Sequence, residues 1–211
     1  MNRRAVEVIA ILGFIALAMS LSRHSAPSRP PLPTPPAGYA GNRFDWYHKE
    51  GQATYQRGYQ LESQGQRPQA YALYAQAAQY YAQARREGER RGDILLPILN
   101  DQAWVEVCQQ NWAREEPFRR ELLEIRQVAQ DSDPTMLAQA HYELARCLQR
   151  QGQHKESQQH YLEAIERQAR AQTGPNWVYY DNYAGLLREM GLTSEADQTA
   201  RRAQELKARS R

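Results

Sequence analysis

An internal repeat constrains this chain more than any other feature of its sequence. Three segments share, without a gap, the same spacing of small residues, large residues and a glycine. The matched positions are Gly58, Leu61, Gly65, Ala70, Tyr74 and Ala77; then Ala145, Leu148, Gly152, Ser157, Tyr161 and Ala164; then Ala184, Leu187, Gly191, Ala196, Ala200 and Ala203. Small residues let two helices approach closely, a large residue fills the space beside them, and the glycine makes the turn. One such pair buries too little apolar surface to be stable alone, so the pairs must stack.

These segments resemble the tetratricopeptide repeat (TPR) family, whose unit is a helix-turn-helix of about 34 residues. The most regular unit is 138–171, AQAHYELARCLQRQGQHKESQQHYLEAIERQARA, and the next begins 39 residues later at Trp177. That longer spacing resembles the extended repeats of kinesin light chains and their bacterial relatives. A degenerate unit fits the longer type from Asn100 onward if one residue is deleted, with Trp104 and Cys108 departing from the pattern.

The resemblance covers residues 44–211 and implies a right-handed superhelix of about four TPR-like helix pairs. An all-α fold is also expected from composition, because strand patterns are nearly absent after Gly41 and helix-forming residues dominate. The remaining prolines lie near expected helix starts. The expected helices are 44–64, 68–88, 93–110, 113–130, 134–151, 154–172, 175–190 and 193–208.

Residues 1–22 are expected to be an N-terminal transmembrane anchor or a signal peptide. Two arginines precede fourteen uncharged residues, 8–21, which is typical of membrane targeting. Cleavage after Ala18 would fit a signal peptidase, whereas 5–22 spans roughly 27 Å as a helix, enough to favour a retained anchor. Basic residues at the amino end favour a cytoplasmic N-terminus, which places the repeat domain outside the cytoplasm, periplasmic or extracellular, or secreted if cleaved.

Residues 23–43 are expected to form a proline-rich linker. Six of the 11 prolines lie within ten residues, 27–36, and such a segment favours the extended polyproline II conformation. It would act as a semi-rigid spacer between the membrane segment and the repeat domain.

Charge and cysteine content exclude several classes of protein. The chain has 27 Lys and Arg against 24 Asp and Glu, and the excess of three lies in residues 1–40. The repeat domain is therefore formally neutral, which argues against a nucleic-acid partner. Two cysteines, Cys108 and Cys147, are too few for a disulfide-built domain or a four-cysteine zinc site. Whether they pair with each other is left open.

The family resemblance implies a binding surface on the inner wall of the superhelix, formed by the first helix of each pair. An extended peptide or a partner's helix commonly binds there. The wall is aromatic, amide-rich and mixed in charge, and aromatic residues and arginine often carry binding energy at interfaces. Its residues are Gln52, Tyr55, Tyr59, Glu62, Asn100, Trp104, Val107, Gln139, Tyr142, Arg146, Gln149, Asp181 and Arg188. The alternative for each of them is packing between repeats.

No catalytic pattern is evident, so neither an enzyme nor a cofactor is expected. Glu156 and His160 lie four residues apart with His154 nearby, a spacing that suits a weak metal site but suits a solvated helix face better. His141 occupies a position that the repeat reserves for a bulky packing residue. We therefore expect no metal.

The sequence thus predicts a non-catalytic protein–protein interaction module, a membrane-tethered scaffold or assembly factor acting outside the cytoplasm. Its partners would be another protein or peptide in the groove and, through the N-terminal segment, the membrane. Two alternatives stay open. One is a self-associating structural subunit of an envelope assembly, and the other is an accessory or regulatory domain of a membrane enzyme.

Overall fold

The computed structural model describes residues 32–87, 92–129, 133–171 and 174–210. The chain divides into two units, 1–34 and 35–211, and nearly all described residues belong to the second. The anchor or signal predicted over 1–22, and the linker up to residue 31, lie outside the described residues. Among the helices of the described ranges, none combines the length and apolar character needed to cross a membrane.

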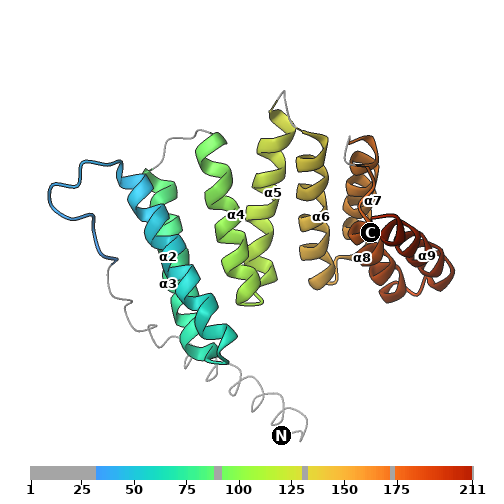
Figure 1. The fold of residues 1–211 in the computed structure, drawn as a ribbon, viewed down its shortest axis with the longest axis horizontal. Coiled ribbons are helices and arrows are strands. Elements are labelled where there is room, and N and C mark those ends of the chain that lie inside the picture. The colour runs from blue at the N-terminus through green and yellow to red at the C-terminus, as the bar shows by residue number, and fades with distance from the viewer. Residues whose placement is uncertain (1–31, 88–91, 130–132, 172–173, 211) are drawn as a thin grey trace, which may run out of the picture. The chain divides into compact units, whose positions relative to one another are not determined.

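Eight helices make up the described part of the chain, and these ranges contain no strand (Figure 1). The helices are α2 (Arg43–Ser63), α3 (Arg67–Glu87), α4 (Gly92–Cys108), α5 (Trp112–Val128), α6 (Pro134–Arg150), α7 (His154–Arg170), α8 (Trp177–Glu189) and α9 (Thr193–Arg209). The prediction of an all-helical fold is confirmed, and every predicted helix end falls within two residues of the observed one. The right-handed superhelical path stays a prediction.

The helices pack as four pairs that follow one another in chain order. Each pair joins two consecutive helices, α2 with α3, α4 with α5, α6 with α7 and α8 with α9. The second helix of a pair then contacts the first helix of the next pair, as Figure 1 shows for α4, which follows the α2–α3 pair, and for α6, which follows α5. First helices also touch each other in two places, α2 with α4 and α6 with α8.

Every pair turns between its helices with the same hydrogen bonds. Gly65, Gly152 and Gly191 have φ of 79°, 73° and 78°, a conformation that only glycine adopts without cost. Each glycine N–H donates to the carbonyl three residues earlier, and the next residue donates to the carbonyl five residues earlier, at 2.9–3.0 Å. This closes the helix end in the Schellman manner. In the second pair Gln110, with φ of 56°, makes the same turn.

The repeated tyrosine explains the spacing of the sequence template. Tyr74 is fully buried beside Gly58, where an added Cβ would lie 2.8 Å from its ring. Its hydroxyl donates to Glu62 Oε2 at 2.7 Å. In the third pair the buried Tyr161 donates to Gln149 Oε1 at 2.8 Å, across the same twelve residues. A small residue, a ring and a polar cap for its hydroxyl thus recur together.

The second pair keeps the backbone of the template but carries charges in its interior. Glu106, Glu115 and Arg119 occupy the positions of Leu61, Ala70 and Tyr74, and they are 7%, 1% and 3% exposed. Arg119 Nε donates to Glu115 Oε1 at 2.9 Å. Within the described part of the chain, Oε2 of Glu106 has no hydrogen-bond partner, and burial raises the pKa of this carboxyl.

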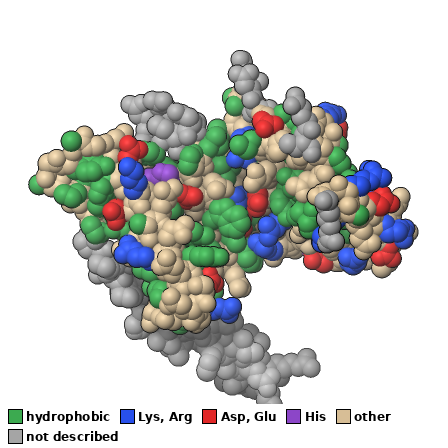
Figure 2. Space-filling model, viewed as in Figure 1, with side chains coloured by type: hydrophobic (Ala, Val, Ile, Leu, Met, Phe, Trp, Pro, Cys, Tyr) green, Lys and Arg blue, Asp and Glu red, His purple; other side chains and the backbone are tan. Residues whose placement is uncertain are grey.

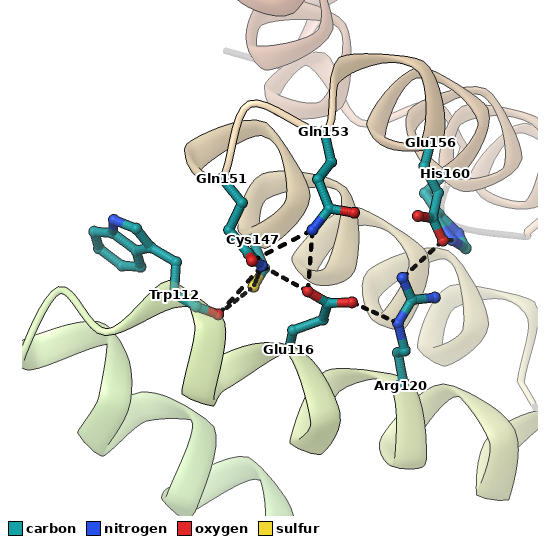
Figure 3. Close-up of polar contacts among 8 residues, drawn as sticks. All are labelled: Trp112, Glu116, Arg120, Cys147, Gln151, Gln153, Glu156 and His160. Atoms are coloured by element: carbon teal, nitrogen blue, oxygen red, sulfur yellow. Dashed lines mark hydrogen bonds and ion pairs between the residues drawn. The ribbon is translucent and has the colours of Figure 1, made fainter. Parts of the chain in front are cut away.

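A polar network joins the second pair to the third (Figure 3). Glu116 on α5 accepts hydrogen bonds from Arg120 Nε at 2.8 Å, Gln151 Nε2 at 2.8 Å and Gln153 Nε2 at 3.2 Å. Burial alone would raise the pKa of Glu116, but these hydrogen bonds lower it. Arg120 also reaches Glu156 on α7 at 2.7 Å. Side chains of α5 therefore hold the turn between α6 and α7.

Candidate functional site

A recess lies where α2, α3 and α4 meet. Tyr55 from α2, Tyr81 from α3, and Asp101 and Trp104 from α4 line its volume of about 220 Å³. A shallower hollow of about 500 Å³ adjoins it and adds side chains of α2, namely Lys49, Gln52, Ala53 and Gln56. Figure 2 shows hydrophobic side chains gathered over the middle of the viewed face, with acidic and basic side chains scattered among them.

Asp101 connects the helices around the recess. Its Oδ2 lies 3.0 Å from His48 Nε2 and accepts a hydrogen bond from Gln52 Nε2 at 3.3 Å. Its side chain is 26% exposed. Burial raises the pKa of Tyr81, and the neighbouring charge of Asp101 raises it further. Burial also raises the pKa of Tyr55, so both phenols stay neutral at physiological pH.

Trp104 forms the outer part of the recess. It is 37% exposed, a large fraction for a tryptophan on a packed helix. The guanidinium of Arg119 lies over its ring, with the carbon 5.4 Å from the ring centroid. The indole therefore keeps an exposed surface while it is fixed by a buried cation.

This chain resembles known proteins in its structure. No family model matches the sequence, and no curated protein matches it. A crystal structure of the putative kinesin light chain TPR-like repeats of Podosopora anserina has a TM-score of 0.59 at 15% identity, covering 77% of each chain. BtubC (BKLC) from P. vanneervenii has a TM-score of 0.55 at 15% identity, over 76% of this chain and 72% of that one.

This chain has the TPR fold. A third solved structure, YrrB, a TPR protein with an unusual peptide-binding site, has a TM-score of 0.50 at 15% identity, over 76% of this chain and 74% of its own. The resemblance to TPR proteins, including the kinesin-light-chain type, is therefore confirmed for the fold.

In the first two TPR pairs, the predicted wall residues divide into lining and packing side chains. Gln52, Tyr55 and Trp104 line the recess or its adjoining hollow, and Tyr59 is 58% exposed. Glu62 and Asn100 instead make hydrogen bonds within the fold. Glu62 accepts from Tyr74, and Asn100 Oδ1 accepts from Arg119 at 3.2 Å.

In the last two TPR pairs, two of the predicted residues border a separate hollow. Gln139 and Tyr142 line a hollow of about 590 Å³ between α6 and α8, with Trp177 and Tyr179 opposite. Tyr142 is only 8% exposed and stacks on Tyr179, with ring centroids 4.5 Å apart. The structure thus gives Tyr142 a packing contact between repeats.

The other predicted residues of these pairs sit apart from that hollow. Arg146 lies over the ring of Tyr142, with its guanidinium carbon 5.6 Å from the centroid. Gln149 donates to Glu189 at 2.8 Å. Asp181 is exposed, and Arg188 lies 3.8 Å from Asp197. The recess at α2, α3 and α4 and the hollow between α6 and α8 share no lining residue. The residues of the predicted wall are therefore divided into two groups.

Sequence reasoning missed Tyr81, Asp101 and His48. The family resemblance selects residues of first helices at fixed positions, whereas Tyr81 belongs to a second helix and reaches the recess past Gly51, where an added Cβ would lie 2.6 Å from its ring. Asp101 lies one position after the selected Asn100. A signal existed in the glycine at 51, since a glycine within a helix often marks a close approach.

The candidate metal residues do not gather as a group of three, because Glu156 and His160 lie 3.9 Å apart while His154 contacts another residue. His154 lies 3.6 Å from Glu189, and Glu156 accepts from Arg120. His160 faces the buried His141, with their Nδ1 atoms 3.0 Å apart. No group of three His, Cys, Asp or Glu that could hold a metal ion occurs in the described ranges.

Both cysteines are free thiols. Cys147 is buried and donates to the Trp112 carbonyl at 3.3 Å, and burial raises its pKa to about 12. Cys108 lies 3.9 Å from the Tyr55 hydroxyl. Each thiol therefore serves as a packing group in this structure.

Proposed function

We propose that this chain is a non-catalytic interaction module that binds a segment of another protein on the α2–α4 face. The observation that carries the proposal is the recess lined by Tyr55, Tyr81, Asp101 and Trp104. Aromatic side chains that are partly exposed and held rigidly are the groups that anchor protein partners, because they bury large area at small entropic cost. The peptide-binding site of YrrB, which shares the fold, gives a precedent.

The partner would lie along α2 and α4 as an extended segment or a helix. Tyr59, one turn beyond Tyr55 on α2, is 58% exposed, and together with Trp104 it offers apolar contact area beside the recess. Gln52 and Gln56 add amides in the hollow, which could pair with a partner's backbone. The hollow near α6 and α8 is a second contact region for a longer partner.

We further propose that the module is a membrane-tethered scaffold or assembly factor outside the cytoplasm. The support lies in the sequence, in the apolar segment within 1–22 and the proline-rich 23–43. Cell fractionation with N-terminal sequencing of the recovered chain tests this. Recovery from membranes with an intact N-terminus is expected, and a soluble cytoplasmic chain would contradict it.

A crosslinked pull-down from intact cells tests partner binding. The C-terminally tagged full chain would be compared with a Tyr59→Ala, Trp104→Ala double variant and with Leu162→Ala. Leu162 is 48% exposed on α7, so it controls for the loss of exposed apolar surface elsewhere. Specific proteins should be lost only with the double variant. Recovery of the chain alone would favour the self-associating subunit, and partners unaffected by the double variant would refute the α2–α4 face.

A further inference from the structure

We infer that the recess formed by Tyr55, Tyr81, Asp101 and Trp104 binds a basic side chain, arginine or lysine, of the partner segment. This inference rests on the proposed function, since it names the residue that the same face would select. The volume of about 220 Å³ is smaller than the roughly 300–1,000 Å³ of sites for drug-sized ligands. The recess therefore has the dimensions of a pocket for one large side chain.

Asp101 makes the recess selective for positive charge. It carries the one carboxyl group among the four lining residues, and burial keeps both phenols protonated. A carboxylate that is three-quarters buried is poorly hydrated, since its side chain is only 26% exposed. An arriving guanidinium or ammonium would restore lost solvation, whereas a neutral or acidic side chain would not.

The three aromatic rings add to this preference. The faces of aromatic rings carry negative potential and attract cations. Trp104 already holds one cation, Arg119. That arginine does not neutralise Asp101, because it is buried against Glu115 at 2.9 Å and lies 3.7 Å from Glu143. Arg119 is thus not a partner of Asp101.

Two other basic groups lie near the recess. His48 Nε2 lies 3.0 Å from Asp101 Oδ2, but His48 is not among the four residues that line the recess. Lys49 lines the adjoining hollow and not the recess itself. It is exposed on a flexible stem, where water and salt screen its charge. Neither group occupies the space among the rings.

Selection from a random peptide library tests the inference. The full chain, in detergent and immobilised by a C-terminal tag, would select displayed peptides, and enrichment of arginine or lysine at one position is expected. The best peptide, made with glutamine in place of that basic residue, should bind about tenfold or more weakly. Asp101→Asn should weaken the original peptide as much, but should not weaken the glutamine peptide further.

The non-additivity of these two changes identifies Asp101 as the contact of the basic residue. Asp197→Asn is the matched control, because Asp197 is an exposed aspartate on α9, and it should leave binding unchanged. Circular dichroism and melting establish that each variant is folded. Trp104→Leu, which removes a ring and keeps Asp101, should also weaken the basic peptide.

The other outcomes of the peptide selection contradict either this inference or the proposed function. Selected peptides without a basic residue would overturn this inference and leave the proposed function standing. Basic peptides with fully additive losses would place the contact elsewhere and would also overturn it. If the wild-type chain retains no peptide, the proposed peptide binding fails together with the inference.

Discussion

At the scale of single residues, Gln110 carries the turn between α4 and α5 with a positive φ. Its φ is 56°, where the equivalent positions of the other pairs hold glycine. A side chain in this conformation costs roughly 1–2 kcal/mol, partly offset by the entropy that glycine loses on folding. Gln110→Gly should therefore raise the free energy of unfolding by about 1 kcal/mol, as measured by urea denaturation.

The reverse change provides the control for this turn. Gly152 has φ of 73° and no neighbouring atom within 4 Å of an added Cβ, so Gly152→Ala tests the backbone alone. It should lower the free energy of unfolding by about 1 kcal/mol. A destabilised Gln110→Gly variant would mean that the glutamine side chain makes a contact worth more than the turn strain.

The buried His141, which contacts His160, predicts a pH dependence of stability. Burial, and then the charge of His160, lowers the pKa of His141 to about 4, against about 6.5 in an unfolded chain. Because the unfolded chain takes up the proton first, the stability is complete above pH 6.5 and declines as pH falls toward 4. The loss from His141 should be about 3 kcal/mol.

His141→Leu tests that prediction, because leucine can occupy the buried site without titrating. Melting of the wild type and the variant would be compared between pH 7 and 4. Charged neighbours Glu163 and Arg167 also influence His141 and are present in both proteins. A wild-type curve parallel to that of His141→Leu would show that the histidine is not the group responsible.

At the scale of elements, the α4–α5 pair has charged residues at core positions where the first pair has Leu61, Ala70 and Tyr74. Glu106 takes the place of Leu61 and is 7% exposed. Its raised pKa means that its carboxyl contributes stability at low pH, which is lost as pH rises through the folded-state pKa. Glu106→Leu should therefore stabilise the protein by about 1–3 kcal/mol at neutral pH, as measured by denaturation.

Glu115→Ala is the contrasting change in the same pair. It removes the nearest carboxylate of the buried Arg119, whose Nε lies 2.9 Å from Glu115, and leaves Glu143 at 3.7 Å as the remaining acidic contact. A buried charge with a weakened partner is costly. A destabilisation of about 3 kcal/mol is expected. If Glu106→Leu were equally destabilising, the interactions of the carboxylate with Arg114 and Asn111 would outweigh the cost of its burial.

The sequence predicted the helix boundaries well and the residues of the binding face only in part. The turn glycines and the first-turn Pro134 are local signals, so all eight helices were predicted within two residues. The recess was only half predicted. Tyr55 and Trp104 lie on first helices, but Tyr81 enters from α3 through the space left by Gly51. That contact joins residues thirty positions apart, and helical periodicity does not report it.

At the scale of the whole repeat domain, Glu116 is one of the residues that couple the second and third pairs. In a stacked array each pair contacts only its neighbours, so the weakest junction limits cooperative unfolding. The Glu116 carboxylate accepts two hydrogen bonds across this junction, from Gln151 and Gln153, and a third from Arg120 of its own helix (Figure 3). Glu116→Ala should separate urea unfolding into two transitions, or lower its slope, at nearly unchanged helicity.

Glu166→Ala controls for the loss of an acidic side chain. Glu166 is exposed and pairs with Arg170 within its own helix, and a surface pair of this kind contributes little. Its variant should unfold as the wild type does. A single sharp transition in Glu116→Ala would place the coupling in the apolar contacts between α5 and α6.

The sequence by itself determined the number, order and ends of the helices, because glycine turns, small-residue spacing and helix propensity act over a few residues. Tertiary structure decided which side chains of the predicted wall are accessible. Tyr55 and Tyr142 hold equivalent repeat positions, yet one lines a recess and the other is stacked on Tyr179. The difference arises from the next pair in the stack, since each face is completed by a neighbour whose side chains the repeat pattern does not fix.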